Sequence, residues 1–365
     1  MTVHDITHYL DQWAPPSLQE SYDNAGLLVG EPDTDCTGVV VTLDITEAVV
    51  QEAIDNDCNL IVAHHPIIFG GLKRLTGRNY VERTVMLALR NNIALYATHT
   101  NLDNVASGVN KKIADRIGLQ EPRILAPKSD LLKKLFVFVP HDHAAEVRHA
   151  IFEAGAGHIG QYDSCSYNVQ GTGTFRGLEG TNPYVGQQGE VHQEPETKIE
   201  VIFPAWQEGA VLQAMQQAHP YEEVAYDVVA LDNAYQEVGS GMIGELVDPM
   251  DEMTFLEHLQ TQMETDCIRY TALRNQPVKR VAVCGGAGSF LLSTAIKAGA
   301  DAFITGDFKY HQFFDADGQI VIADIGHFES EQFTIELIAE KLREKFSNFA
   351  VRLTEINTNP IQYLS

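Results

Sequence analysis

The sequence of 365 residues has few cysteines, few basic residues and no long apolar run. Its five cysteines are scattered and odd in number, and no Cys-x-x-Cys pair exists. Neither a cysteine-based zinc module nor a disulfide framework is therefore indicated. Lysine and arginine number 25 against 50 aspartates and glutamates, a formal net charge of −25. This excess argues against nucleic acid as a partner, because affinity for its backbone depends on clustered basic residues.

The apolar runs are also too short for a membrane span. The longest, such as Leu60–Ala63 and Pro66–Phe69, fall far below the length that crosses a bilayer. The N-terminal MTVHDITHYLDQW has no basic segment followed by an apolar stretch, so we expect no signal peptide. We expect a cytoplasmic globular protein, without a membrane partner, of two or three domains.

Both ends of the chain show apolar, β-branched runs that alternate with helical patterns. The runs carry little polar alternation, which is typical of strands buried on both faces of a parallel sheet. Towards the N-terminus we expect strands at Gly38–Asp44, Asn59–Ala63 and Ile93–Thr98 and helices at 46–54, Val81–Arg90 and Val109–Ile117. Towards the C-terminus we expect strands at Arg280–Cys284, Asp301–Thr305, Gln319–Ala323 and 351–356 and helices at Ser289–Lys297 and Ser330–Phe346.

The middle of the chain follows another pattern, a weak internal repeat. A strand and a helix occur twice, each time followed by a strand-like stretch. The two copies are Leu135–Pro140, Ala144–Ala154 and Gln161–Val169, then Ile199–Pro204, Glu208–Ala218 and Glu223–Val229. Two such βαβ units predict a ferredoxin-like α+β domain, interrupted by a loop at Gly177–Glu196.

The simplest domain organisation is an insertion. We expect residues 1–128 and 237–365 to form one discontinuous α/β domain, with a largely parallel sheet and helices on both faces. Residues 129–236 form the inserted domain, which an exposed loop can accept because domain termini often lie close together.

Polar side chains gather where four of the predicted strands end. Ligands bind beyond the carboxyl ends of the strands in open α/β sheets, so these segments are expected to converge. They are His64-His65 after LIVA, THTNLD at Thr98–Asp103, Gly306-Asp307 followed by Tyr310-His311, and GHFESE at Gly326–Glu331.

The spacing of these residues favours two metal ions. His327 and Glu331 are four apart at a helix start, so they share a face and can chelate one ion. His64 and His65 are adjacent in extended chain and point to opposite sides, so each suits a different ion. Asp103 can bridge the two, because a carboxylate has two oxygens. Histidine and carboxylate ligands without a thiolate fit Zn, Mn, Fe or Co better than Ca.

Each motif also has a structural interpretation. The histidine pair can be incidental, THTNLD can be a turn with a capped helix, and H-x-x-x-E can be a solvated helical pair. Their convergence favours the metal site. Cys284–Ser289 is better explained as a tight turn than as a phosphate cradle, because it lacks the full GxGxxG spacing and a Walker lysine. Asp44 can support a ligand or cap a helix, and Tyr22–Gly26 can form a pocket wall or a turn.

The ordered set YDNAGLLVG, LIVAHHPIIF, THTNLD, ITGDFKYH and GHFESE resembles the Ngg-interacting-factor-three-like family. Its bacterial members are commonly named GTP cyclohydrolase I type 2 homologues. The resemblance covers about residues 1–125 and 240–365, and HPYEEVAYDV at 219–228 resembles the PII/CutA-like insert of the longer members.

The resemblance implies a dinuclear metal site and a toroidal homohexamer around an internal cavity. When the metal ligands of the family are carried over to this sequence position by position, they fall on residues that the spacing also selects. His99 matches a further histidine of the family's site. Phe328 stands where tyrosine is common in the family, which removes a hydroxyl but no ligand. The implied ligands are His64, His65, Asp103, His327 and Glu331.

Our functional expectation is a metal-dependent hydrolase. Two divalent transition-metal ions per chain, zinc ahead of iron, manganese or cobalt, would act on a nucleotide or phosphoester-like small molecule. His99 or His311 could carry protons. The alternative is a non-catalytic metal-binding or regulatory hexameric assembly, which the PII-like insert favours.

Overall fold

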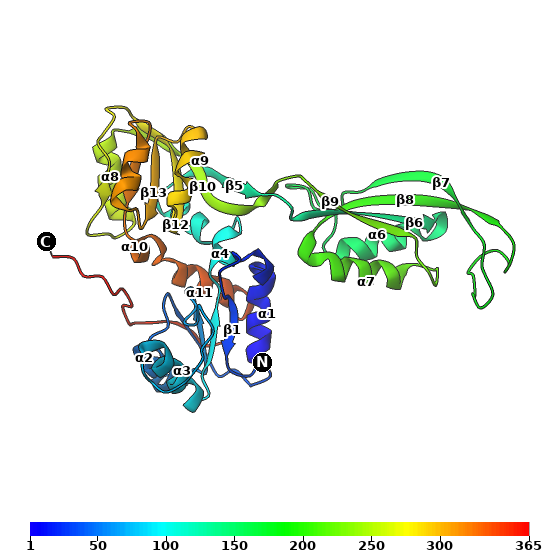
Figure 1. The fold of residues 1–365 in the computed structure, drawn as a ribbon, viewed down its shortest axis with the longest axis horizontal. Coiled ribbons are helices and arrows are strands. Elements are labelled where there is room, and N and C mark those ends of the chain that lie inside the picture. Colours follow the sequence, from blue (N-terminus) through cyan, green and yellow to red (C-terminus); the bar gives the residue numbers. More distant parts are fainter. Residues whose placement is uncertain (365) are drawn as a thin grey trace. The chain divides into compact units, whose positions relative to one another are not determined.

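The computed structural model describes residues 1–364, and the chain divides into two compact units (Figure 1). The first unit comprises Met1–Ala126 and Glu237–Ser365, and the second comprises Pro127–Gln236. The expected boundary after residue 128 lies two residues from the observed division. No helix within residues 1–364 is long and apolar enough to cross a membrane.

The first unit is an α/β structure with two sheets rather than one. The first sheet has the order β1-β4-β3-β2-β15, and all its neighbours are parallel except the antiparallel pair β1 and β4. Every residue of the three central strands is buried, which explains their uninterrupted apolar sequences. The bounds are Gly26–Val29 (β1), Val39–Thr42 (β2), Leu60–Ala63 (β3), Ala94–Ala97 (β4) and Val351–Leu353 (β15).

The second sheet of this unit has the order β11-β14-β13-β12-β10-β5. Its central strands β12, β13 and β14 are parallel, whereas β10 and β11 pair antiparallel with β12 and β14. The bounds are Gln120–Lys128 (β5), Tyr235–Met250 (β10), Arg269–Tyr270 (β11), Val278–Ala287 (β12), Ala302–Gly306 (β13) and Val321–Asp324 (β14).

Amphipathic helices cover both sheets. Thr46 accepts a hydrogen bond from the Val49 N–H and so caps α2, which packs with α3 on the first sheet around Ile61. The helices are α1 (Val3–Trp13), α2 (Glu47–Asp55), α3 (Tyr80–Arg90), α4 (Thr100–Asn104), α5 (Val109–Arg116), α8 (Glu252–Gln262), α9 (Leu292–Lys297), α10 (His327–Glu331) and α11 (Thr334–Lys345). Short 3-10 turns lie at Pro16–Leu18 (η1), Ser289–Leu291 (η4) and Tyr310–Ala316 (η5).

One helix differs from its predicted extent. The continuous helix expected over Ser330–Phe346 is two helices, because α10 ends at Glu331 and α11 begins at Thr334. The break separates the five-residue α10, which carries His327 and Glu331, from α11, which packs against β2 and β15. No glycine or proline marks the break in the sequence, so the local pattern could not show it.

The inserted unit is a four-stranded antiparallel sheet with the order β7-β8-β6-β9. This is the ferredoxin-like arrangement expected from the repeat. Figure 1 shows α6 and α7 on the same face of the sheet, where their apolar side chains complete a separate core. The elements are β6 (Leu132–Pro140), α6 (Ala144–Glu153), β7 (Tyr167–Phe175), β8 (His192–Pro204), α7 (Glu208–Ala218) and β9 (Tyr226–Leu231), with 3-10 turns η2 (His141–His143) and η3 (Ala205–Gln207).

Two predicted boundaries in this unit are wrong. The strand expected at Gln161–Val169 begins at Tyr167 and runs to Phe175, and the loop expected over Gly177–Glu196 already contains the first residues of β8. Both errors have one cause. The β7–β8 hairpin continues beyond the apolar core, so its distal residues are exposed and carry no apolar alternation.

Candidate metal centre

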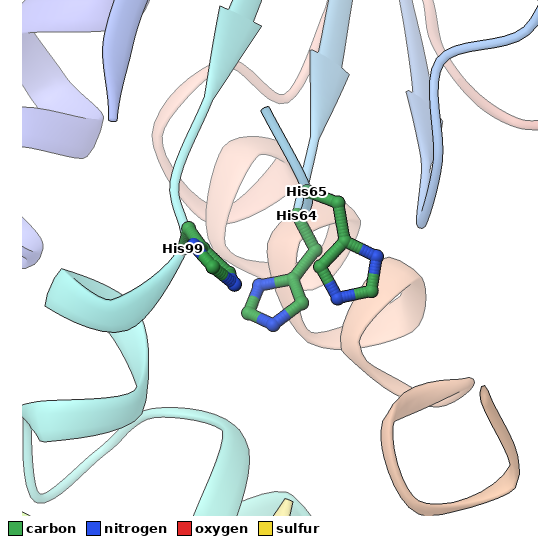
Figure 2. Close-up of side chains that lie close together, drawn as sticks. All are labelled: His64, His65 and His99. Carbon is green, nitrogen blue, oxygen red and sulfur yellow. The ribbon is translucent and has the colours of Figure 1, made fainter. Parts of the chain in front are cut away.

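Four potential ligands come from two neighbouring strands of the first sheet. His64 and His65 follow β3, and His99 follows β4 at the N-cap position of α4, which carries Asp103. Figure 2 shows the three imidazoles gathered beyond the strand ends. The His64 and His99 ring centroids are 5.3 Å apart, as are those of His65 and His99.

Two further potential ligands come from the second sheet. His327 and Glu331 are the first and last residues of α10, one helical turn apart on the same face. Glu331 lies against Gly286 of β12, where a Cβ atom would stand 2.5 Å from the Glu331 Oε1 atom. Gly286 also has a φ of +61°, which strongly favours glycine. The tight turn expected at 284–289 is wrong: residues 284–287 end β12, where the register with β13 shifts, and Gly286 leaves room for a carboxylate.

The side chains form two overlapping groups that could each hold an ion, and Glu331 belongs to both. In one group, the His64 Nε2 atom lies 3.6 Å from the Asp103 Oδ1 atom and 3.7 Å from Glu331 Oε1. In the other, Glu331 Oε2 lies 3.0 Å from His65 Nε2 and 3.2 Å from His327 Nε2. A third group joins His99 to His64 and His65. Glu331 thus belongs to two of the groups and Asp103 to one, whereas the sequence had suggested Asp103 as the bridge between two ions.

The outer ring nitrogens of these histidines have fixed partners. The His64 Nδ1–H donates to the Thr98 carbonyl oxygen over 2.9 Å, which leaves its Nε2 lone pair directed at the cluster. The Nδ1 atoms of the other three histidines each form a hydrogen bond of 2.8 Å with a carboxylate. Histidines that bind metal ions commonly have such a carboxylate partner on the ring nitrogen that does not bind the metal. The three carboxylates are those of Asp44 for His65, Asp23 for His99 and Asp307 for His327.

Two buried atoms of the first group have no hydrogen-bond partner among the described residues. They are His64 Nε2, on a fully buried side chain, and Asp103 Oδ1. Such unpaired buried polar atoms are costly unless something binds them. Both atoms can donate an electron pair to a metal ion, and they lie 3.6 Å apart without a hydrogen bond between them. The residues present therefore fit a metal ion.

The electrostatics of the ion-free cluster point the same way. Burial opposes the charged form of His65, but hydrogen bonds to Asp44 and Glu331 outweigh it and raise the His65 pKa to about 10. The charge of Glu331 raises the pKa of His327 to about 9. Burial and the neighbouring Glu331 charge raise the pKa of Asp103 to about 7. Without an ion, these shifts favour the protonated forms of His65 and His327.

These pKa values predict that metal binding releases protons. A pH of 7 lies below the pKa values of both His65 and His327, so both side chains are protonated at this pH. A histidine that binds a metal must be a neutral imidazole. Apparent affinity should therefore rise as the pH rises from 7 towards 9. Calorimetric titration of Zn²⁺ in two buffers of different ionisation enthalpy measures the release, and His327→Ala should release fewer protons. A binding enthalpy independent of the buffer would contradict this assignment.

A cavity of about 730 Å³ opens onto the cluster. Four exposed aromatic side chains border it, namely Tyr22, Phe69, Tyr80 and Phe290. His65, His99, Asp103, His327 and Glu331 line the cavity, whereas His64 is fully buried. His311 is exposed on η5 beside Tyr310 and Phe314 and is not part of the cavity wall.

Sequence reasoning missed several supporting residues. The C-terminal segment lines the cavity, and the Thr358 hydroxyl donates to Asp44 Oδ2 over 2.9 Å. Asp307 has a positive φ of 58° at the end of β13, an uncommon conformation that accompanies its bond to His327. Asp307 was visible as a polar residue at a strand end, but nothing in the sequence marked Thr358. For Asp44 and Asp23, whose roles the sequence left open, the structure shows contacts to site histidines.

Comparison with known proteins gives full-length matches. Residues 1–360 match the family Duf34/NIF3 (NGG1p interacting factor 3). The "GTP cyclohydrolase 1 type 2 homolog" of Halalkalibacterium halodurans is 38% identical over 98% of both chains, and that of Bacillus subtilis is 36% identical over the same shares.

A solved structure agrees with these relatives. The Bacillus cereus protein related to NIF3 has a TM-score of 0.88 and 36% identity, and the match covers 100% of this chain and 99% of that one. Sequence, fold and the resemblance seen in the motifs agree over the whole length: the chain belongs to the Duf34/NIF3 family.

Proposed function

We propose that the protein is a metal-dependent hydrolase with two divalent transition-metal ions, zinc foremost, that acts on a nucleotide or phosphoester-like small molecule. The observation that carries the proposal is the pair of ligand groups sharing Glu331 on the wall of a cavity of about 730 Å³. His64 and Asp103 with Glu331 would hold one ion, and His65 and His327 with Glu331 the other.

Bound ions at such a site acidify water and polarise an oxygen of the substrate. The chain's own residues supply orientation and proton transfer. Asp23 accepts a hydrogen bond from His99 Nδ1, and two bonds from Thr100 help to fix its carboxylate. Burial opposes the charge of Asp23, but these bonds hold its pKa well below the usual range. His99 is thereby kept with Nε2 available, in the position of a general base or acid.

The cavity also suits a substrate with a planar ring. The aromatic side chains at its border, Tyr22, Phe69, Tyr80 and Phe290, are 56–70% exposed and so can receive a ring by stacking. A nucleotide combines such a ring with phosphate oxygens that a dinuclear centre can bind. The names of the relatives, homologues of a GTP cyclohydrolase, agree with this class.

The test compares metal-loaded wild type with Asp103→Ala on GTP and on a panel of phosphate monoesters and diesters. Metal-dependent turnover by wild type, lost together with metal in the variant, supports the proposal. Full turnover by Asp103→Ala would overturn it. Metal binding without turnover of any compound would instead favour the non-catalytic alternative.

A further inference from the structure

The inserted unit contains a second cavity, of about 580 Å³, which the proposed hydrolase does not use. The edge strand β7 forms one wall, from Val169 to Phe175. The β7–β8 loop contributes Tyr184, and the segment after α7 contributes Tyr221. All its lining residues belong to the inserted unit, so this unit alone defines the cavity.

Three aromatic rings from these separate segments meet at the cavity. The ring centroid of Tyr221 lies 5.9 Å from that of Phe175 and 6.2 Å from that of Tyr184. A hydrogen bond of 3.0 Å joins the Tyr184 hydroxyl to His143 Nε2 and ties the loop to the folded unit. The ring of Tyr221 is tilted by 60° against Phe175 and by 48° against Tyr184, so these rings are not stacked in parallel, and all three line the cavity.

A buried carboxylate lies beside these rings. Glu196 of β8 is 8% exposed, and its Oε1 atom accepts a hydrogen bond of 3.2 Å from the Tyr221 hydroxyl. A hydroxyl does not neutralise the negative charge, and burial accordingly raises the pKa of Glu196. On β7, a Cβ atom at position 173 would stand 2.1 Å from Glu196 Oε2, so Gly173 leaves the space that the carboxylate occupies.

The charges around the cavity favour a cationic ligand. Three carboxylates line it, those of Glu196, Glu222 and Glu223. Of the two lining cations, Arg176 and Lys198, the lysine is already paired with Glu200, with 2.8 Å between Lys198 Nζ and Glu200 Oε1. An anion such as phosphate would meet this negative excess, whereas aromatic faces and a carboxylate both attract a positive charge.

We propose that this cavity binds a small organic ammonium compound, with Phe175, Tyr184 and Tyr221 around the cation and Glu196 as its counter-charge. The aromatic faces accept an alkylated nitrogen without hydrogen bonds, and the carboxylate supplies the opposite charge. The size of the cavity is in the range of small-molecule sites. The site is independent of the metal centre, so its ligand binds with or without metal.

The test uses full-length protein and ligand-observed saturation-transfer NMR. The probes are choline, butylammonium and 3,3-dimethylbutan-1-ol, which has the shape of choline without its charge. We expect transfer to at least one ammonium compound and none to the neutral alcohol. Transfer to choline alone would show that the ligand is a compound with an alkylated nitrogen. Transfer to butylammonium alone would show that its nitrogen donates hydrogen bonds.

Matched variants locate the binding. Glu196→Gln removes the negative charge and should lower the affinity for the ammonium compound by about tenfold or more. Gly173→Ala keeps the charge but displaces the carboxylate and should weaken binding similarly. Glu153→Gln, an exposed change on α6 outside the cavity, should leave it unchanged. Failure of both ammonium compounds to bind, equal binding of the alcohol, or full binding by folded Glu196→Gln would overturn the proposal.

Discussion

Glu331→Gln is expected to lose both metal ions, from about two per chain to close to none. The reason is the shared position of this carboxylate, whose Oε1 faces His64 while Oε2 faces His65 and His327. An amide removes the negative charge from both groups at once. It also replaces one accepting oxygen by an NH₂ group, which cannot bind a metal. Elemental analysis after reconstitution with zinc measures the loss.

The same helix provides the control for this experiment. Glu329 is also buried on α10, but its Oε1 atom accepts a hydrogen bond from Asn359 and it belongs to neither ligand group. Glu329→Gln should keep both ions. His327→Ala should lose one of them, because His327 belongs to one group only. Retention of one full equivalent by Glu331→Gln would show that the two groups do not share this residue.

Removal of metal by a chelator is expected to lower the melting temperature of the first unit by roughly 10 °C. A ligand present at a thousandfold excess over its dissociation constant stabilises the folded state by about 4 kcal/mol. For a unit of this size each kcal/mol corresponds to about 2–4 °C. A bound ion would also offset the repulsion between the carboxylates of Asp103 and Glu331, which raises the pKa of Asp103 in its absence.

Differential scanning calorimetry with and without chelator measures this shift. The inserted unit has its own core, built around Val137 and Val201, and holds neither ligand group, so its transition should not move. The Glu331→Gln variant serves as the control, since it should melt at the same temperature with and without chelator. An equal chelator shift in that variant would mean that the stabilising ion binds elsewhere.

The sequence was most informative where strands end. Buried runs such as LIVA predict strand positions, and the neighbouring parallel strands β3 and β4 then bring His64, His65 and Asp103 together at one sheet, while His327 and Glu331 follow a strand of the other. Local pattern and the binding of ligands at strand ends were enough to nominate these residues from a single sequence, and the structure places their side chains close together.

Contacts between distant segments could not be predicted from the sequence. Thr358 bonds to Asp44 across 314 positions, and no periodicity links the two. The position of Glu331 in two potential ligand groups likewise depends on contacts between segments of two separate sheets. The break between α10 and α11 was also beyond the sequence, because the helix propensities of residues 330–346 do not mark where one helix ends and the next begins.

The separation of the two ligand sets along the chain imposes an order on biosynthesis. His65 and Glu331 are 266 positions apart, and the whole inserted sheet, from Leu132 to Leu231, is encoded between them. During translation, all residues of the inserted unit are therefore synthesised before the two potential ligands of α10, His327 and Glu331. An ion that meets the nascent chain early finds only the donors near β3 and β4. If the proposed centre forms, it can be completed only after residue 331 has left the ribosome, and therefore after the whole inserted unit has been synthesised.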